Sequence, residues 1–285
     1  MKKLTIQNFN TIYATEEVCL DKLFILRYGS LKVCPSCNKR TNFYKRSNKK
    51  AYACQWCGYL ISPTANTIFH KSETSLTKWF YALYLFSTSK NGVSAKELER
   101  QLGVTYKCAW RIAKQIRQLF EENSEALSKI VEVDETYIGG KGGNNKRGRG
   151  SENKTSVLGM LERKNTVKAR VTVDTKRKTV MPIIRKHIKL GTEIMSDEYL
   201  PYQSLGREGY KHETISHGQN EYARGNVHVN SLEGFWSQLK RSINGTYHCV
   251  SPKYLQSYVN EFSYRYNNRF SSEPLFDLML SQILK

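Results

Sequence analysis

Carboxylates that end two short apolar runs are the residues of this chain best suited to chemistry. The run IVEVDETYIGG carries Asp134 and stops at two glycines, and the run IMSDEYLPY carries Asp197. Side chains of a strand alternate between its faces, so Asp134 shares a face with Glu132 while Glu135 lies on the other. Each aspartate also has an ordinary interpretation, a solvated strand end for Asp134 and a helix N-cap for Asp197. We expect Glu132 and Glu135 to be neighbours of a site rather than its ligands.

A third polar group lies on one side of an expected helix in the segment HVNSLEGFWSQLKR. At about 100° per residue, Asn230, Glu233 and Lys240 form a polar stripe beside an apolar face. That apolar face consists of Leu232, Phe235, Trp236, Leu239 and Ile243. Asn230 and Glu233 could alternatively form a variant of the capping box, which would leave Lys240 and the two aspartates unexplained.

Together these side chains are the ligands that a hard divalent cation prefers. Oxygen atoms from Asp134, Asp197 and Glu233 suit Mg²⁺ or Mn²⁺ and leave coordination positions for phosphate oxygens. Such ions activate a water or a 3′-hydroxyl for displacement at phosphorus, which is the chemistry of cutting and joining DNA strands. Lys240 would then hold a phosphate as a point charge. Whether Asn230 or Glu233 is the third ligand stays open, because both are present.

Four of the seven cysteines form two Cys-x-x-Cys pairs, Cys34 with Cys37 and Cys54 with Cys57. This arrangement places four thiolates around one Zn²⁺, and so small a loop could hardly hold its shape without the metal. A disulfide or redox role is the alternative. The aromatic and basic residues between the pairs predict either a hairpin that meets DNA or the solvated face of a structural zinc ribbon. The three isolated cysteines favour a reducing compartment over a disulfide framework.

The elements that must position the carboxylates are short strands separated by turns and one helix. We expect strands over residues 130–138, 156–161 and 167–173, which would form a three-stranded meander. A helical crossover over residues 179–187 then leads to a fourth strand over residues 193–196, which ends at Asp197. Strands, a crossover and another strand indicate a mixed sheet flanked by helices.

Two helices before this sheet have the pattern of a helix-turn-helix. Ser94 and Glu97 fit a capping box at the start of the first helix, and Gly103 ends it. The second helix begins near Thr105 and carries a basic side and an opposite apolar side. The basic side consists of Lys107, Arg111, Lys114 and Arg117. This pattern is typical of a helix set against a DNA groove, and an ordinary amphipathic hairpin with a solvated basic side is the alternative.

The overall charge indicates a polyanionic partner. The 285 residues include 45 Lys and Arg against 25 Asp and Glu, a formal net charge of +20. Double-stranded DNA is therefore the leading partner, well ahead of an anionic membrane surface. The glycine-rich segment at residues 139–154 adds further basic residues for backbone contacts, namely Lys141, Lys146, Arg147 and Arg149.

The N-terminal residues lack the continuous apolar segment of a signal peptide. The longest apolar run, residues 79–86, is too short to span a bilayer. We therefore expect a cytoplasmic, nucleoid-associated protein without a membrane partner.

The residues at the carboxylates resemble a known set of catalytic motifs. Asp134 in VDETYIGGK, Asp197 in SDEYLPY, and Asn230, Glu233 and Lys240 are similar to those of DDE-type insertion-sequence transposases. The resemblance is to the lineage with an N-terminal zinc ribbon and an Asp-Asp-Asn/Glu-Lys signature. The spacing between Asp197 and Glu233, 233 − 197 = 36, also suits that superfamily.

This resemblance covers most of the chain and implies a ribonuclease H-like catalytic fold. It also implies a DNA transposase that binds the ends of its insertion sequence and uses Mg²⁺ (or Mn²⁺) for strand cleavage and strand transfer. Pairing two element ends further suggests a homo-oligomer on DNA.

The expected fold class is multidomain α+β: a zinc ribbon, a helix-turn-helix, and a ribonuclease H-like mixed sheet flanked by helices. We expect a helical lead-in over residues 1–30, the ribbon over 31–62, the helix-turn-helix region over 63–125, the catalytic domain over 126–250 and a helical extension over 251–285. Two other functions fit the same features. One is a DNA-binding regulator without catalysis, and the other is a structure-specific nuclease that cuts without joining. A tyrosine recombinase is disfavoured, because none of the six histidines has an arginine three residues later.

Overall fold

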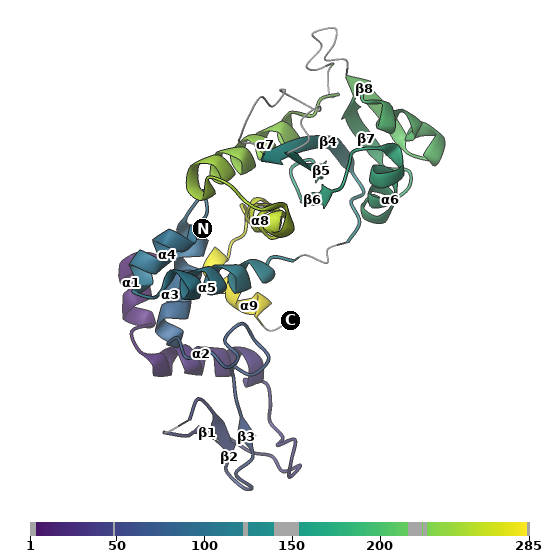
Figure 1. The fold of residues 1–285 in the computed structure, drawn as a ribbon. Helices are drawn as coiled ribbons and strands as arrows, with labels where there is room; N and C mark the ends of the chain where they lie inside the picture. The colour runs from purple at the N-terminus through teal and green to yellow at the C-terminus, as the bar shows by residue number, and fades with distance from the viewer. Residues whose placement is uncertain are drawn as a thin grey trace. The chain divides into compact units, whose positions relative to one another are not determined.

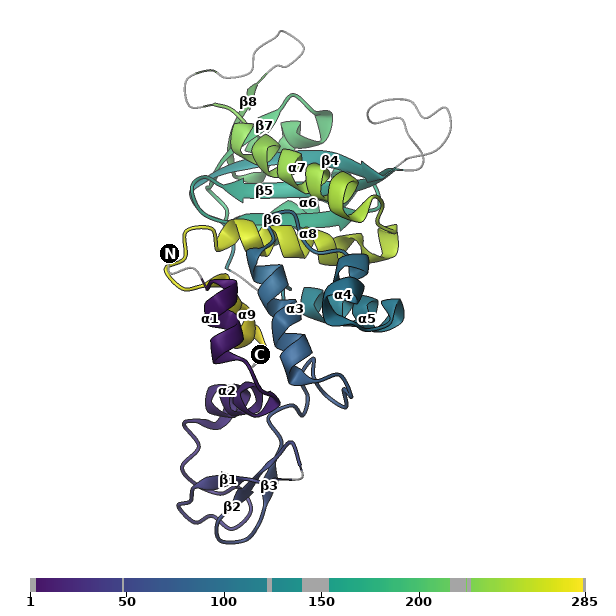
Figure 2. The same cartoon turned by 90° about the vertical axis from the view of Figure 1, so that its left-hand side faces the viewer.

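The protein divides into two compact units, Met1–Leu119 with Ser271–Lys285, and Phe120–Phe270. Figures 1 and 2 show the chain in two views. The structure, a computed structural model, describes residues 4–47, 49–121, 125–139, 154–215, 224 and 227–283.

Most helices of the first unit have a Ser or Thr side chain as their N-cap. Five of them are α1 (Ile6–Ile12), α2 (Glu16–Tyr28), α3 (Leu76–Thr88), α4 (Ala95–Leu102) and α5 (Tyr106–Gln118), and α9 (Leu275–Gln282) is the sixth described helix. The residue before each of the first five accepts the backbone N–H three residues further on, which satisfies one otherwise unpaired donor. These caps are Thr5, Thr15, Ser75, Ser94 and Thr105.

The turn between α4 and α5 follows the expected pattern. Ser94 Oγ accepts the N–H of Glu97 at 3.1 Å. Gly103 ends α4 in the left-handed region, with φ of 58°, where a residue with a Cβ would be strained. The apolar side of α5 is buried, including Ile112 and Ile116. The two helices and the turn between them are thus as the sequence predicts.

A small three-stranded antiparallel sheet follows α2. It consists of β1 (Phe43–Lys45), β2 (Tyr52–Cys54) and β3 (Leu60–Ile61), in that order. The ring of Phe24 in α2 stacks on Tyr52 at a centroid distance of 3.9 Å. Helix α2 therefore covers one face of this sheet.

The second unit is built on a five-stranded mixed sheet with the order β6-β5-β4-β7-β8. Its strands are β4 (Ile130–Gly139), β5 (Lys154–Glu162), β6 (Val167–Thr172), β7 (Glu193–Asp197) and β8 (Lys211–Ile215). The pairs β6–β5 and β5–β4 are antiparallel, whereas β4–β7 and β7–β8 are parallel. The sequence predicts the first four strands but not β8, whose polar residues KHETI lie at the edge of the sheet.

Helices cover both faces of this sheet (Figure 1). One face packs against α6 (Arg177–His187) and the short 3₁₀ helix η1 (Leu200–Ser204), which a second 3₁₀ helix, η2 (Gly206–Glu208), follows. The other face packs against α7 (Asn230–Ser242), the π-helical turn η4 (Ile243–Tyr247) and α8 (Pro252–Asn267). Figure 2 shows α7 and α8 running along that face. Each fully buried large apolar side chain contributes roughly 1.5–3 kcal/mol to such packing.

The C-terminal extension expected over residues 251–285 is divided between the two units. Helix α8 packs against β6 and belongs to the second unit. Helix α9 belongs to the first, where Phe276 contacts the rings of Phe9 and Tyr13.

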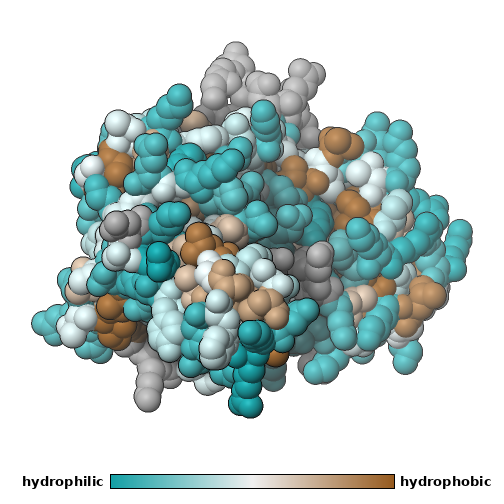
Figure 3. All heavy atoms as spheres, turned by 90° about the horizontal axis from the view of Figure 1, so that it is seen from below, coloured by the Kyte–Doolittle hydropathy of each residue, from teal (hydrophilic) through white to brown (hydrophobic). Residues whose placement is uncertain are grey.

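Hydrophilic residues cover most of the face in Figure 3, and hydrophobic residues form small separate patches there. No helix within the described ranges has the length and apolar character needed to cross a membrane.

Candidate functional site

The two aspartates lie at corresponding positions of neighbouring parallel strands. In the β4–β7 ladder Glu132 is opposite Met195, and the paired residues end there. Continuing that register by two residues places Asp134 opposite Asp197. Both side chains are half-buried. Asp197 also accepts the N–H of Tyr199 at 3.1 Å. It is not a helix N-cap, because Tyr199 is the N-cap of the 3₁₀ helix that follows and no side chain makes a capping bond there.

Asp134 is held by the helix that crosses its face of the sheet. The indole N–H of Trp236 in α7 donates to Asp134 Oδ2 at 3.0 Å. Burial, followed by the charges of Glu135 and Asp197, raises the pKa of Asp134 to about 7, and the indole N–H of Trp236 opposes this shift. The ionised carboxylate is therefore costly in this place unless a cation compensates it.

A glycine allows α7 to approach the sheet this closely. Gly159 in β5 is directly opposite Asp134 in β4. A Cβ built on Gly159 would lie 2.8 Å from Leu232 Cδ1 and would also overlap the ring of Trp236. A glycine inside an apolar strand can mark such a close approach, so Gly159 is the sequence signal for this contact.

Glu132 shares the face of Asp134 but has a different set of contacts. Its fully buried carboxylate accepts the Nε–H of Arg163 at 2.7 Å and the backbone N–H of Leu232 at 2.9 Å. The hydroxyl of Ser231 donates to it at 3.0 Å. This carboxylate satisfies donors of the first turn of α7.

Glu135 and Tyr202 form a link on the opposite face. The Tyr202 hydroxyl donates to Glu135 Oε2 at 2.8 Å, and both side chains are buried. Burial and the charge of Glu135 raise the pKa of Tyr202 well above its usual value. Glu135 directly follows Asp134, and Tyr202 lies in η1, five residues after Asp197. The bond therefore joins the segment that follows Asp134 to the segment that follows Asp197. No local sequence pattern predicts this contact.

The polar stripe of α7 faces solvent beside Asp134. Asn230, Glu233 and Lys240 are exposed. Asp134, Glu233 and Lys240 line one cleft of about 800 Å³, together with Trp236, Ser237 and Arg241. Desolvation lowers the pKa of Lys240, whereas the charge of Asp134 raises it.

The capping-box interpretation of Asn230 and Glu233 is wrong. Val229 is the N-cap of α7, and neither Asn230 nor Glu233 makes a capping hydrogen bond there. Asn230 is instead the first residue of the helix, and its side chain is exposed.

The three predicted carboxylate ligands are not gathered at a common point. Asp134 shares the cleft with Glu233 and the strand register with Asp197, but Asp197 does not line the cleft. Apart from four cysteines, no three His, Cys, Asp or Glu side chains lie close enough to hold a metal ion in the described ranges.

Those four cysteines form a compact metal site. The Sγ atoms of Cys34, Cys37, Cys54 and Cys57 all lie within 4.8 Å of one another. The Cys34–Cys57 and Cys37–Cys54 sulfur distances are 3.7 and 3.9 Å. Tetrahedral Zn²⁺ with bonds of about 2.3 Å separates its sulfurs by about 3.8 Å, so the arrangement fits zinc. A disulfide would need about 2.05 Å, and that alternative is wrong for these cysteines.

The predicted DNA-binding residues of α5 are not equivalent. Lys107 and Lys114 are exposed. Arg111 is half-buried and donates to the hydroxyls of Ser72 and Thr74.

The prediction that Arg117 lies on the basic side of α5 is wrong. It is only 3% exposed, donates to the carbonyl of Val93 at 3.2 Å and lies over the ring of Phe86. It therefore belongs to the packing of the first unit. The four remaining predicted residues, Lys141, Lys146, Arg147 and Arg149, lie outside the described residues.

Two segments of the chain match known protein families. Residues 126–267 match the ISXO2-like transposase domain, and residues 14–60 match the transposase zinc-ribbon domain. The chain is therefore a transposase of an insertion sequence. It belongs to the family in which a zinc ribbon precedes an ISXO2-like transposase domain.

Two relatives support this assignment. An uncharacterized protein in transposable element ISH50 of Halobacterium salinarum is 24% identical over 274 residues, which are 89% of this chain and 91% of the relative. An uncharacterized transposase-like protein of Haemophilus influenzae is 26% identical over 90 residues, which are 32% of this chain and 72% of the relative.

Proposed function

We propose that this protein binds the ends of its own insertion sequence and moves that DNA by hydrolysis and strand transfer. A water would attack the phosphodiester at each element end and break its bond to the 3′-oxygen, which leaves a 3′-hydroxyl on the element and a 5′-phosphate on the flanking strand. That 3′-hydroxyl would then attack a phosphodiester of the target and displace the target's 3′-oxygen as a hydroxyl. The observation that carries this proposal is the shared register of Asp134 and Asp197 beside the cleft that Glu233 and Lys240 line.

The sheet order supports a ribonuclease H-like fold for the second unit. Three antiparallel strands in the order third, second, first continue into two parallel strands, with helices on both faces. The short capped turn between α4 and α5 supports a helix-turn-helix in the first unit, with Lys107 and Lys114 as the DNA contacts of its second helix.

Asp134, Asp197 and Glu233 would hold Mg²⁺ or Mn²⁺, with Asn230 as the alternative third ligand. Such an ion would neutralise negative charge at phosphorus and lower the pKa of the attacking water or hydroxyl. The raised pKa of Asp134 supports this assignment, because a cation would offset the repulsion that raises it. Lys240 would bind a phosphate oxygen of the strand that lies in the cleft.

Two element ends must be paired for transposition, so a homo-oligomer on DNA and a place at the nucleoid follow from the proposed reaction. A regulator would bind the ends without metal-dependent chemistry. A nuclease would cut them without joining.

The test is strand cleavage and joining on duplex DNA with the element ends, in the presence of Mg²⁺. Asp134→Asn and Asp197→Asn should abolish both products, while Glu213→Gln, an exposed acid of β8 in the same sheet, should keep them. Wild-type-like joining by Asp134→Asn would refute the assignment of the site. Glu233→Gln and Asn230→Ala, compared under the same conditions, decide between the two third ligands.

A further inference from the structure

The two faces of the small sheet in the first unit have different surroundings. Phe43, Lys45 and Tyr52 lie on the face that α2 covers. On the other face Tyr44, Ala53 and Leu60 form a cross-strand row. Tyr44 is 58% exposed and Leu60 is 43% exposed, so this second face is open. We call it the open ribbon face, and it consists of Tyr44, Arg46, Lys49, Gln55 and Leu60 with the backbone around them.

Acidic residues are confined to the covered side. The Nζ of Lys45 lies 3.7 Å from carboxylate oxygens of both Glu17 and Asp21 in α2. The Nζ of Lys50 lies 2.6 Å from Glu16. These two lysines are thus largely neutralised within the protein.

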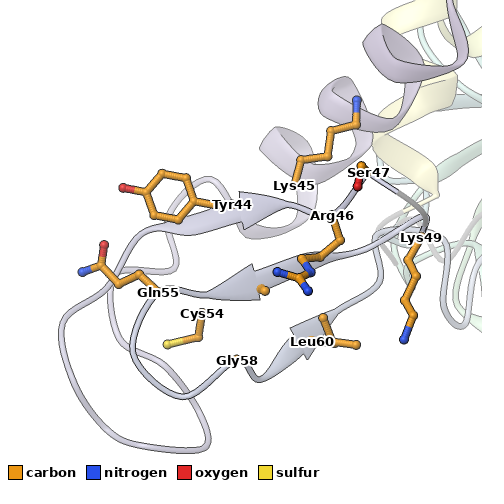
Figure 4. A pocket seen from close by; sticks show the side chains of 10 residues that line it. Tyr44, Lys45, Arg46, Ser47, Lys49, Cys54, Gln55, Gly58 and Leu60 are labelled. Atoms are coloured by element: carbon orange, nitrogen blue, oxygen red, sulfur yellow. The ribbon is translucent and has the colours of Figure 1, made fainter.

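The cations of the open ribbon face have no such acids. Among the described residues, neither Arg46 nor Lys49 forms an ion pair with a carboxylate. Figure 4 shows Lys45 extending toward α2, while Arg46 and Lys49 point the other way. The positive charge of this face is therefore available to an external anion.

The open ribbon face is also hollowed. A cavity of about 590 Å³ lies against it, and its described lining includes Tyr44, Arg46, Lys49, Gln55 and Leu60 but no acidic residue. Lys45 also borders this cavity, with its amine extending toward α2 (Figure 4). This concave surface carries the cations Arg46 and Lys49, the exposed phenol of Tyr44 and the amide of Gln55. Such a surface suits a convex polyanion that also offers hydrogen-bond donors and acceptors. Duplex DNA has this chemistry, since its phosphates repeat along both strands and its base edges carry donors and acceptors.

We propose that the open ribbon face binds the double-stranded DNA of the element end, with Arg46 and Lys49 on backbone phosphates and Tyr44 against the sugar edge. The inference rests on the proposed function, because it is this function that makes the element end the partner. DNA then contacts the open ribbon face and not the face that α2 covers.

Two double variants test this with equal changes of charge. Arg46→Ala/Lys49→Ala and Lys45→Ala/Lys50→Ala each remove two cations from the same small sheet. The full zinc-loaded chain is titrated, without Mg²⁺, against a duplex carrying the terminal sequence that flanks the gene, at several salt concentrations. Equilibrium anisotropy gives the affinity and its salt dependence.

The variant of the open face should bind at least about tenfold more weakly, and the slope of log K against log salt should fall by about 1.8, since each phosphate contact contributes about 0.9. The Lys45/Lys50 variant should stay within about threefold of the wild type, because its two cations are neutralised by α2. Bound zinc, measured after thiol modification, must be one ion per chain in both variants.

Equal losses in the two variants, or a loss of less than threefold at the open face, would overturn the proposal. Failure of the proposed function has a different signature. A protein that binds the duplex through Arg46 and Lys49 but neither cleaves nor joins it would keep this inference and refute the reaction.

Discussion

The carboxylate of Glu132 accepts the backbone N–H of Leu232 at 2.9 Å, and this bond fixes the first turn of α7 to the centre of the large sheet. Two residues further along the same strand face, Asp134 meets the same helix through the indole N–H of Trp236. One acid thus anchors the helix, and the other stands at the cleft that the helix lines. Their different partners predict opposite effects of neutralising them.

Glu132→Gln should lower the free energy of unfolding of the second unit by about 3 kcal/mol, because it removes the buried negative charge that pairs with the guanidinium of Arg163. Urea unfolding followed by hydrogen exchange in α7 measures this change. The matched variant Asp134→Asn should leave the metal-free protein at least as stable as the wild type, since it removes a carboxylate whose charge is unfavourable there. Equal destabilisation by both variants would contradict the division of roles.

Gly159→Ala should cost about 1–3 kcal/mol, because the added methyl overlaps Leu232 and Trp236 in a packed interface. It should also slow DNA cleavage, because it displaces the indole that holds Asp134. Gly234→Ala is the control, since a Cβ there meets nothing within 4 Å. This helical alanine should raise stability by up to about 1 kcal/mol. Unfolding curves and single-turnover cleavage check both variants.

Tyr202→Phe removes the donor that Glu135 uses on the buried side of the site. Loss of this bond should cost about 1–3 kcal/mol, because a buried carboxylate loses a hydrogen-bond donor. It should also raise the Mg²⁺ concentration needed for half-maximal cleavage, because the segments behind Asp134 and Asp197 are no longer joined. Tyr199→Phe, whose hydroxyl contacts Thr175, should leave the Mg²⁺ requirement unchanged. A shift of the same size in both variants would show that the link has no special role.

Removal of zinc should unfold the small sheet and spare the large one. The metal supplies about 10 kcal/mol or more in sites of this kind, more than three short strands can provide. Chelation, or Cys57→Ser, should open residues 31–62 to protease while residues 154–215 stay protected. Cys249→Ser, an exposed cysteine outside the cluster, should change neither region. Protection of the ribbon after complete chelation would be the contrary result.

The stability of the second unit should fall in mild acid, in part because of His187. Burial lowers the pKa of His187 to about 4, and the charges of Arg170, Lys168 and Lys186 act in the same direction. Its unfolded form titrates near 6.5, so between pH 6.5 and about 4 the unfolded chain binds the additional proton. Stability from this group is therefore complete above pH 6.5 and is lost as the pH falls toward 4.

His187→Gln should flatten the pH dependence of unfolding in that interval, measured by urea titration at several pH values. An unchanged slope would mean that the imidazole is not the titrating group.

Local patterns predicted much of what positions the site. The alternation of side chains in β4 separated Asp134 and Glu132 from Glu135, because a strand has a fixed period of two. The spacing of the cysteines and the cap at Ser94 depend on short-range geometry, and both agree with the structure.

Features set by tertiary packing were missed. The helical period placed Arg117 on the basic side of α5, but only the fold reveals that Val93 and Phe86 cover it. The bond between Glu135 and Tyr202 joins residues 67 positions apart, and no local pattern encodes that contact. Strand β8 has few apolar residues because it lies at the sheet edge, so its sequence lacks the usual signal.

The closeness of Gly159 to Trp236 has an evolutionary consequence. Any larger residue at position 159 would require a smaller one at position 236, and a smaller residue there would remove the indole donor from Asp134. The two positions should therefore be inherited as a pair. A relative with a side chain at the equivalent of Gly159 must have acquired another way to orient its first aspartate.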